Sequence, residues 1–156
     1  MSEVYLSRAG VAKLQEELKK LHGMKKQLSI DIGEAREKGD LKENAEYHSA
    51  KERLGEVMNR ISLIDTKLEK VRLTDEIKTP PGVVAIGVKV TLQMEDGDEF
   101  SYTLVGEDES DPAEGKISVY SPLAQGLLGK KIGEQATVEL PAGSRVYKIV
   151  KTEPGS

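Results

Sequence analysis

The 156-residue sequence contains no cysteine, no tryptophan and a single phenylalanine. The lack of cysteine excludes disulfides and thiolate metal sites, and it suits a reducing compartment. The scarcity of aromatic side chains excludes a large aromatic core. No apolar run approaches the length of a membrane span, and the N-terminus lacks the apolar core of a signal peptide. We therefore expect a soluble cytoplasmic protein with no membrane partner.

Charge is distributed unevenly along the chain. Residues 1–74 contain 15 Lys and Arg against 13 Asp and Glu, a net charge of +2, whereas residues 75–156 contain 8 against 14, a net charge of −6. The whole chain therefore has a net charge of −4. This balance excludes a protein that binds nucleic acid through a basic surface overall. Any contact with nucleic acid must be local.

Two series of apolar positions, each with alternating steps of three and four, predict two long helices that pack in coiled-coil fashion. The two series are mirror images about residue 41, which indicates an antiparallel hairpin with its tip at residues 39–44. Lys25 is the one polar residue in the series, and Ser7 is a suitable N-cap for the first helix. The two series are Val11, Leu14, Leu18, Leu21, Lys25, Leu28, Ile32 and Ala35, and then Tyr47, Ala50, Leu54, Val57, Ile61, Ile64, Leu68 and Val71.

The C-terminal half has the pattern of a small β-sheet domain. The hairpin is expected to occupy residues 1–74, a proline-containing linker residues 75–82, and the sheet domain residues 83–156. The β-prone stretches that predict strands are residues 88–94, 100–105, 116–120, 137–140 and 145–151. The fold class is therefore α+β, a long antiparallel coiled-coil hairpin followed by a small, mostly antiparallel sheet.

Turn and cap residues divide this second half. Asp96-Gly97 is typical of a β-hairpin turn. Ser121 and Pro122 resemble the N-cap and first residue of a helix, and Gly129 is a suitable stop. The sheet is therefore expected to be accompanied by one short helix.

Asp40 and Glu43 are the candidate metal-ligating residues at the predicted tip. Two carboxylates three positions apart at the start of a helix lie close together, and carboxylate oxygens suit a hard cation such as Mg²⁺. Two carboxylates make a poor permanent site, so they would better complete a site that a partner supplies. The same spacing matches a capping box, with Asp40 as the N-cap and Glu43 reaching back to its backbone N–H. Spacing alone leaves both interpretations open.

Cationic residues near the tip could contact phosphates. Exposed cations on helices are, however, more often solvated or weakly paired. Tyr47 and His48 are near enough to the tip to stack on a base, although the seam position of Tyr47 favours packing. The cationic residues are Arg36, Lys42, Lys51 and Arg53.

Two segments resemble the Gre family of bacterial transcript cleavage factors. Residues 34–48, with the sequence EAREKGDLKENAEYH, resemble the tip of the family's coiled coil. Residues 117–130, with the sequence ISVYSPLAQGLLGK, resemble its C-terminal domain. The two segments have the order and spacing of the family, and the resemblance covers nearly the whole chain. It implies an FKBP-like fold for the C-terminal domain.

The resemblance implies a role in rescuing RNA polymerase that has backtracked and extruded the 3′ end of its RNA. The coiled coil would enter the polymerase's secondary channel, and the C-terminal domain would dock on the channel rim. Asp40 and Glu43 match the family's two tip acids, which help to hold a second, weakly bound Mg²⁺ jointly with the polymerase and to position the attacking water. The polymerase is the catalyst, so this chain is expected to be an accessory factor and to bind no Mg²⁺ tightly by itself.

The resemblance also assigns contacts with RNA and polymerase. Arg36 and Lys51 match basic positions that engage the extruded RNA, and Lys42 and Arg53 are added because they are close to the tip. The residues expected to dock on the polymerase rim are Tyr120, Ser121, Pro122 and Gln125.

This docking segment departs from the family at two positions. Tyr120 stands where an acidic residue or Asn is common, and Gln125 where a basic residue is common. The departures concern binding at the rim and leave the tip chemistry unchanged.

Three other functions are compatible with parts of the sequence. The first is a regulator or inhibitor that uses the same channel without stimulating cleavage, although such relatives tend to have a more acidic tip. The second is a prolyl isomerase or chaperone, but those pockets are lined by aromatic residues, which are few here. The third is a structural coiled-coil adaptor, against which the tip signature argues. Within the family, the net charge of +2 over residues 1–74 favours the less basic of its two main types.

Overall fold

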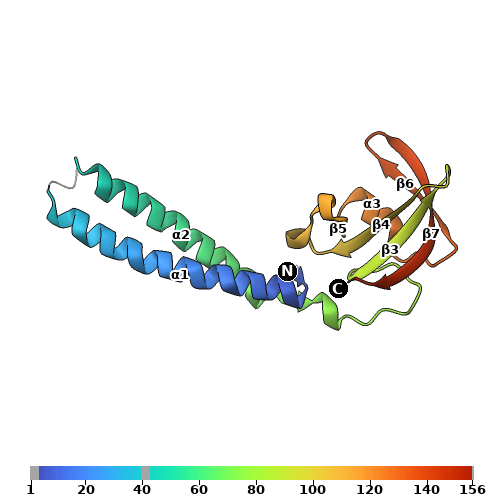
Figure 1. Ribbon diagram of the computed structural model, residues 1–156, viewed down its shortest axis with the longest axis horizontal. Coiled ribbons are helices and arrows are strands. Elements are labelled where there is room, and N and C mark those ends of the chain that lie inside the picture. The colour runs from blue at the N-terminus through green and yellow to red at the C-terminus, as the bar shows by residue number, and fades with distance from the viewer. Residues whose placement is uncertain (1–3, 40–42, 156) are drawn as a thin grey trace. The chain divides into compact units, whose positions relative to one another are not determined.

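The computed structural model describes residues 4–39 and 43–155. The chain divides into two compact units: Val11–Lys70, and a second unit in which residues 4–10 accompany residues 71–155. The first is a helical hairpin and the second is built around a β-sheet, so the predicted fold class is confirmed (Figure 1). None of the described helices is both long and apolar enough to span a membrane.

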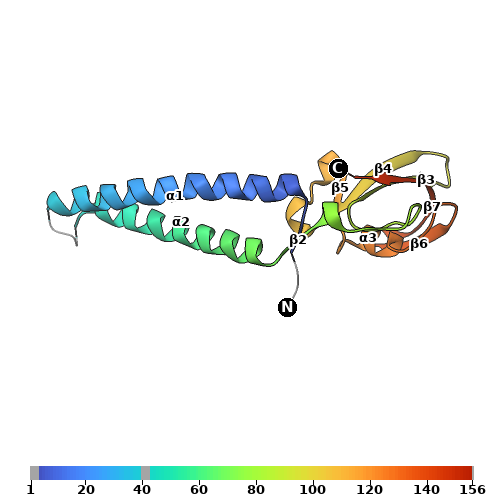
Figure 2. The same cartoon turned by 90° about the horizontal axis from the view of Figure 1, so that it is seen from below.

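The hairpin consists of α1 (Arg8–Glu37) and α2 (Ala45–Glu69), which lie antiparallel and side by side in both views (Figures 1 and 2). Most of the predicted seam positions are buried or half-buried. Burial of an aliphatic side chain contributes about 1.5–3 kcal/mol, so this seam is the main source of the hairpin's stability. Its central cluster consists of Leu28, Val57 and Ile61, with Leu18, Leu21, Met24, Ala50 and Leu54 packed against them.

The predicted position of Lys25 in the seam is wrong. Lys25 is exposed, and the neighbouring Met24 is half-buried against the central cluster. Both positions lie near the seam between Leu21 and Leu28. Burial of a lysine ammonium without a partner would be costly, whereas the flexible methionine side chain fills an irregular apolar space. The seam therefore passes through Met24.

The second seam series ends earlier than predicted. Helix α2 stops at Glu69, and Val71 begins strand β2 (Val71–Leu73), so the expected pairing of Val71 with Val11 is wrong. Strand β2 lies parallel to β1 (Val4–Leu6), with Val4 opposite Val71. Parallel neighbours require a long connection, which the hairpin supplies here. Both strands are only three residues long, too short for a periodic pattern in the sequence.

A bidentate ion pair connects the two helices. The Nε and Nη2 atoms of Arg60 donate hydrogen bonds to the Glu17 carboxylate at 2.7 and 2.9 Å. Hydrogen bonding from Arg60 lowers the pKa of Glu17 below its ordinary value of 4.5. Because the folded-state pKa is lowered, this stabilisation is present above the unfolded-state pKa and is lost as pH falls through the folded-state pKa.

Replacing Glu17 with glutamine is expected to lower the free energy of unfolding by at most about 1 kcal/mol at neutral pH. The effect is small because the side chains of Arg60 and Glu17 are 38% and 39% exposed. Urea unfolding followed by circular dichroism should show the difference at about pH 7 and lose it near pH 3. Glu16→Gln, at the exposed neighbouring position, is the matched control. A difference that grows toward acid would contradict this assignment.

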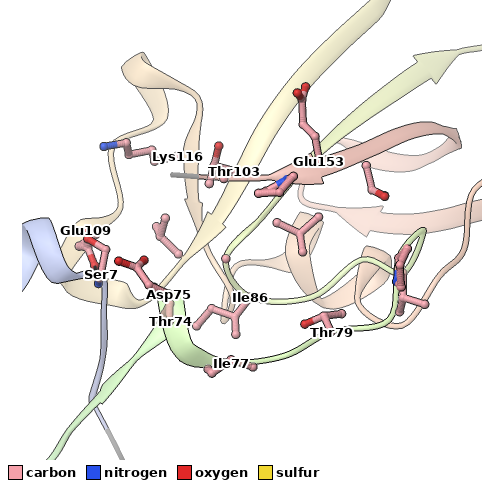
Figure 3. A pocket seen from close by; sticks show the side chains of 18 of the residues that line it. Ser7, Thr74, Asp75, Ile77, Thr79, Ile86, Thr103, Glu109, Lys116 and Glu153 are labelled. Atoms are coloured by element: carbon pink, nitrogen blue, oxygen red, sulfur yellow. Dashed lines mark hydrogen bonds between the residues drawn. The ribbon is translucent and has the colours of Figure 1, made fainter.

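The N-terminus of α1 is fixed within the second unit. The N–H of Gly10 donates to Ser7 Oγ at 3.0 Å, which confirms Ser7 as the N-cap. The Ser7 N–H and hydroxyl donate in turn to Glu109 at 2.6 and 2.7 Å, and the Arg8 N–H donates to Asp75 at 3.2 Å. Figure 3 shows Ser7, Asp75 and Glu109 near one another. Two carboxylates at a helix N-terminus also interact favourably with its dipole.

The sheet of the second unit has five strands in the order β5-β4-β3-β7-β6. The pairs β3–β4, β3–β7 and β6–β7 are antiparallel, whereas β4 and β5 are parallel, so the sheet is mostly antiparallel, as expected, with one parallel pair at this edge. The strands are β3 (Val88–Met94), β4 (Glu99–Val105), β5 (Lys116–Ser118), β6 (Gln135–Leu140) and β7 (Gly143–Pro154). Three 3-10 turns accompany them: η1 (Thr74–Glu76), η2 (Glu107–Glu109) and η3 (Pro112–Glu114).

The predicted short helix is α3 (Pro122–Leu127), and Ser121 is its N-cap. It contributes Ala124 and Leu127 to the sheet's core. Gly126 allows this close packing, because a Cβ at that position would lie 2.7 Å from Cγ2 of Val138 in β6. The helix thereby fixes the segment that follows β5, where the expected docking residues are located.

Candidate functional site

The hairpin tip is the principal candidate site, and Asn44 organises its described part. The Asn44 side-chain oxygen accepts the Tyr47 N–H at 3.1 Å, which makes Asn44 the N-cap of α2. Its Nδ2 donates to the Ala35 carbonyl at 2.5 Å, in the last turn of α1. One side chain therefore satisfies a free donor at the start of α2 and an acceptor at the end of α1. This role of Asn44 was not predicted from the sequence.

The capping-box interpretation of the tip acids is wrong. Helix α2 begins at Ala45, so Glu43 precedes the N-cap and is not the third residue of the helix. Glu43 is exposed, and among the described residues it has no hydrogen-bond or ion-pair partner. Asp40 and Lys42 lie outside the described residues. No described residue therefore competes for the Glu43 carboxylate, which is exposed and can accept hydrogen bonds or bind a cation.

A magnesium ion fits this site only if a partner supplies further ligands to it. Carboxylate oxygen is the ligand type that Mg²⁺ prefers, and Glu43 presents one without a competing partner among the described residues. The part of the chain that the structure describes has no group of three or more His, Cys, Asp or Glu able to hold a metal. Glu43 can therefore contribute to a site whose other ligands come from elsewhere, but it cannot form one alone.

The predicted cations occupy different surroundings. Arg36 Cζ lies 5.9 Å and Lys51 Nζ 5.7 Å from the centre of the Tyr47 ring, so the fold brings these two together. Arg53 is exposed and has no assigned contact among the described residues. His48 lies edge-on to Tyr47, with ring centres 5.4 Å apart. The two cations and the two rings form one cluster next to the tip.

Hydrogen bonding from Arg36 lowers the pKa of the Tyr47 hydroxyl, and the positive charge of Lys51 adds to this effect. Burial of the residue acts in the opposite direction. An electrostatic preference for the anionic phenolate indicates positive potential around this hydroxyl. The cluster is therefore a local basic region on a chain with a net negative charge.

The predicted docking residues lie on the segment between β5 and α3. Tyr120 is 57% exposed, whereas the Ser121 hydroxyl accepts the Ala124 N–H as the helix cap, with Pro122 as the first helical residue. Gln125 donates from Nε2 to the Val119 carbonyl at 2.6 Å. Tyr120 therefore presents an aromatic surface, and Gln125 stabilises the loop that presents it.

The second unit also contains a cavity of about 610 Å³. Its wall includes Ile77, Ile86, Thr103 and Lys116 (Figure 3). All of its lining residues are described, and none of them is aromatic. Phe100, Tyr102, Tyr120 and Tyr147, the aromatic residues after position 75, lie elsewhere. The cavity therefore lacks the aromatic lining that the prolyl isomerase alternative requires.

Regions similar to known proteins extend over almost the whole chain. Residues 4–73 match the family model "Transcription elongation factor, N-terminal", and residues 79–154 match "Transcription elongation factor, GreA/GreB, C-term". The chain is 44% identical over 153 residues to "Transcription elongation factor GreA" of Hyphomonas neptunium, with 97% of this chain and 98% of the relative covered. It is 46% identical over 154 residues to the protein of the same description in Alkalilimnicola ehrlichii, with 97% and 98% covered.

Solved structures with a similar chain include GreA factor homolog 1 of Thermus thermophilus. The match covers 97% of this chain and 99% of the homolog, with 24% identity and a TM-score of 0.44.

Proposed function

The chain belongs to the GreA/GreB family of transcription elongation factors, and on this premise we propose that it inserts its hairpin into the secondary channel of RNA polymerase. There it stimulates the polymerase's own cleavage of backtracked RNA. The protein is an accessory factor of RNA polymerase, and the catalytic centre belongs to the polymerase. Its proposed location is the cytoplasm, where bacterial transcription takes place.

The observation that carries this proposal is the freedom of Glu43. Helix α2 is capped by Asn44, so Glu43 is an exposed carboxylate next to the end of an arm of two helices. The 25 residues of α2 span about 37 Å at about 1.5 Å per residue. An arm of this length, with an exposed carboxylate at its end that pairs with no described residue, suits delivery of a ligand into a deep channel.

At the polymerase's active centre, Asp40 and Glu43 would hold a second Mg²⁺ jointly with the polymerase. In two-metal hydrolysis of a phosphodiester, the ions stabilise the attacking and leaving oxygens. The chain's own contribution is to place carboxylates that bind the ion and orient the attacking water by accepting its hydrogen bonds. No tight binding of Mg²⁺ by the isolated chain is required.

The remaining site residues have proposed roles in binding. Arg36 and Lys51 contact phosphates near the extruded 3′ end of the RNA, and Lys42 and Arg53 add to this contact. At the channel rim, the exposed ring of Tyr120 packs against the polymerase. Ser121, Pro122 and Gln125 keep the loop that carries Tyr120 in place through the helix cap and the loop hydrogen bond.

The test uses a stalled, backtracked elongation complex with labelled RNA. Adding the chain is expected to speed the release of fragments from the RNA 3′ end, in a manner that depends on Mg²⁺ and saturates with the chain's concentration. The chain without polymerase should leave the same RNA intact. If the chain binds polymerase but does not stimulate cleavage at any Mg²⁺ concentration, it is instead a channel-binding regulator.

A further inference from the structure

Tyr47 lies where charged groups from both helices of the hairpin converge. Arg36 is in the last turn of α1, and Lys51 is one turn beyond Tyr47 in α2. Both charged groups lie within 6 Å of the centre of the same ring. Tyr47 itself is only 7% exposed, so the ring is held by the packing of the seam. The tyrosine is therefore a fixed support for two long, otherwise flexible side chains.

The two cations have no opposing acid in the described part of the chain. No described carboxylate forms an ion pair with Arg36 or Lys51, although Lys38 and Glu46 pair nearby at 3.6 Å. Like charges repel, so two unpaired cations would tend to separate. Attraction to the negative face of an aromatic ring offsets this repulsion and favours their shared position. Such a pair remains available to an anion.

Electrostatics at the hydroxyl agree with this arrangement. The lowered pKa of Tyr47 has hydrogen bonding from Arg36 as its largest cause and Lys51 as a further one. Both cations therefore act on this side chain from within close range. A phosphate group that approaches the two cations would meet two positive charges.

We propose that Tyr47 is a positioning residue that holds Arg36 and Lys51 as a preformed pair for a phosphodiester group of the extruded RNA. The inference rests on the proposed function, because it presumes that RNA reaches the tip. It goes beyond that function in assigning the alignment of the two cations to a buried aromatic residue. Preorganisation of this kind lowers the entropy lost when flexible cations bind a phosphate. The role assigned to Tyr47 requires no contact with the reacting atoms or with a metal ion.

A role confined to packing would give a different result on substitution. Leucine at position 47 retains an apolar side chain in the seam but removes the ring, whereas phenylalanine retains the ring and removes only the hydroxyl. Tyr47→Leu is expected to lower the cleavage rate at saturating factor about five- to tenfold, as loss of two exposed cation–π contacts implies. Tyr47→Phe should stay within about twofold of the wild type, because the ring still binds both cations. A tenfold loss with phenylalanine would overturn the role of the ring.

A double-mutant cycle separates positioning from stability. The Tyr47→Leu change is combined with Arg36→Ala and Lys51→Ala, and cleavage is measured at saturating factor and at two salt concentrations. If Tyr47 acts through the cations, leucine should cause no further loss in the variant that lacks them. The salt dependence of cleavage by the Tyr47→Leu variant should also be weakened, to the same extent as for the variant that lacks both cations. Full additivity of the losses would overturn the proposal.

Two controls distinguish this proposal from the proposed function. Circular dichroism and binding to polymerase establish that each variant is folded and engaged with its partner. If the wild type fails to stimulate cleavage, the proposed function fails, and this inference fails with it. If the wild type stimulates cleavage and Tyr47→Leu equals it, only the positioning role of Tyr47 is overturned.

Discussion

Replacement of Glu43 by glutamine is expected to lower stimulated RNA cleavage at least about tenfold, the smallest effect typical of disturbing a metal site. Glutamine preserves the size of the side chain, but its neutral amide is a poorer ligand for Mg²⁺ than a carboxylate. Glu43 is exposed, precedes the cap of α2 and has no partner among the described residues. The change therefore removes a charge without removing a contact within the described fold. Cleavage rates at saturating factor measure the loss.

Asp40→Asn is expected to give a loss of the same kind. Asn44 caps α2, so the exchange at position 40 does not remove the cap of that helix. Binding to polymerase, measured by competition with the wild type, should be unchanged for both variants. Higher Mg²⁺ concentrations should partly restore cleavage, because a weakened site is refilled by mass action.

Glu46→Gln is the matched control for both substitutions. Glu46 is another exposed carboxylate near the tip, but it lies in the first turn of α2 and pairs with Lys38. Its exposed ion pair contributes little to stability, and the variant should cleave at the wild-type rate. Equal losses in Glu46→Gln and Glu43→Gln would indicate a general effect of negative charge. Wild-type cleavage by both Glu43→Gln and Asp40→Asn would show that the assignment of metal ligands is wrong.

The hairpin was predictable because its stability comes from a repeated physical requirement. Each turn of α1 and α2 must bury an apolar side chain against the other helix, and that requirement is visible as steps of three and four. The prediction failed at Lys25 because periodicity alone does not separate two adjacent positions near the seam. Burial of the charged Lys25 side chain costs more free energy than burial of Met24, and this difference selects Met24 as the seam residue.

The cap of α2 was missed because a familiar motif was present nearby. Asp40 and Glu43 match a capping box by spacing, but that spacing alone does not fix where the helix starts. The relevant signal was Tyr47, the first seam residue of the second series. An N-cap side chain bonds the N–H two or three residues later, and Asn44 lies three residues before Tyr47. Asn44 was therefore identifiable from the sequence, whereas its bond to Ala35 depended on the fold.

The direction of β5 could not be derived from its own residues. Lys116–Ser118 has the composition of a strand in either orientation. Whether it runs parallel to β4 depends on the path of residues 106–115, which contain η2 and η3. Glu109 of η2 accepts both hydrogen bonds that Ser7 donates, and Ser7 is distant in the sequence. Such a contact between remote segments leaves no local pattern, and the same is true of the cavity.

Asn44→Ala is expected to have the largest effect on the stability of the tip. The substitution removes the N-cap of α2, which costs about 1 kcal/mol, and the hydrogen bond to the Ala35 carbonyl, which contributes about 1 kcal/mol more. Urea unfolding followed by circular dichroism should therefore show a loss of about 2 kcal/mol. Cleavage at saturating factor should fall as well, because Glu43 is attached directly to the residue that fixes its position.

Asn44→Asp separates the two contributions of this side chain. Aspartate caps helices about as well as asparagine, but it has no amide N–H to donate to Ala35. The aspartate variant should therefore lie between the wild type and the alanine variant in stability, and α2 should still begin at the same residue. Stability of the aspartate variant equal to that of the wild type would show that the bond to Ala35 contributes nothing. Stability of the alanine variant equal to that of the wild type would refute the cap itself. If cleavage falls in parallel with stability across the wild type and the two variants, the position of the Glu43 carboxylate depends on the Asn44 side chain, which connects the ends of the two helices. The acids at the tip would then not act alone.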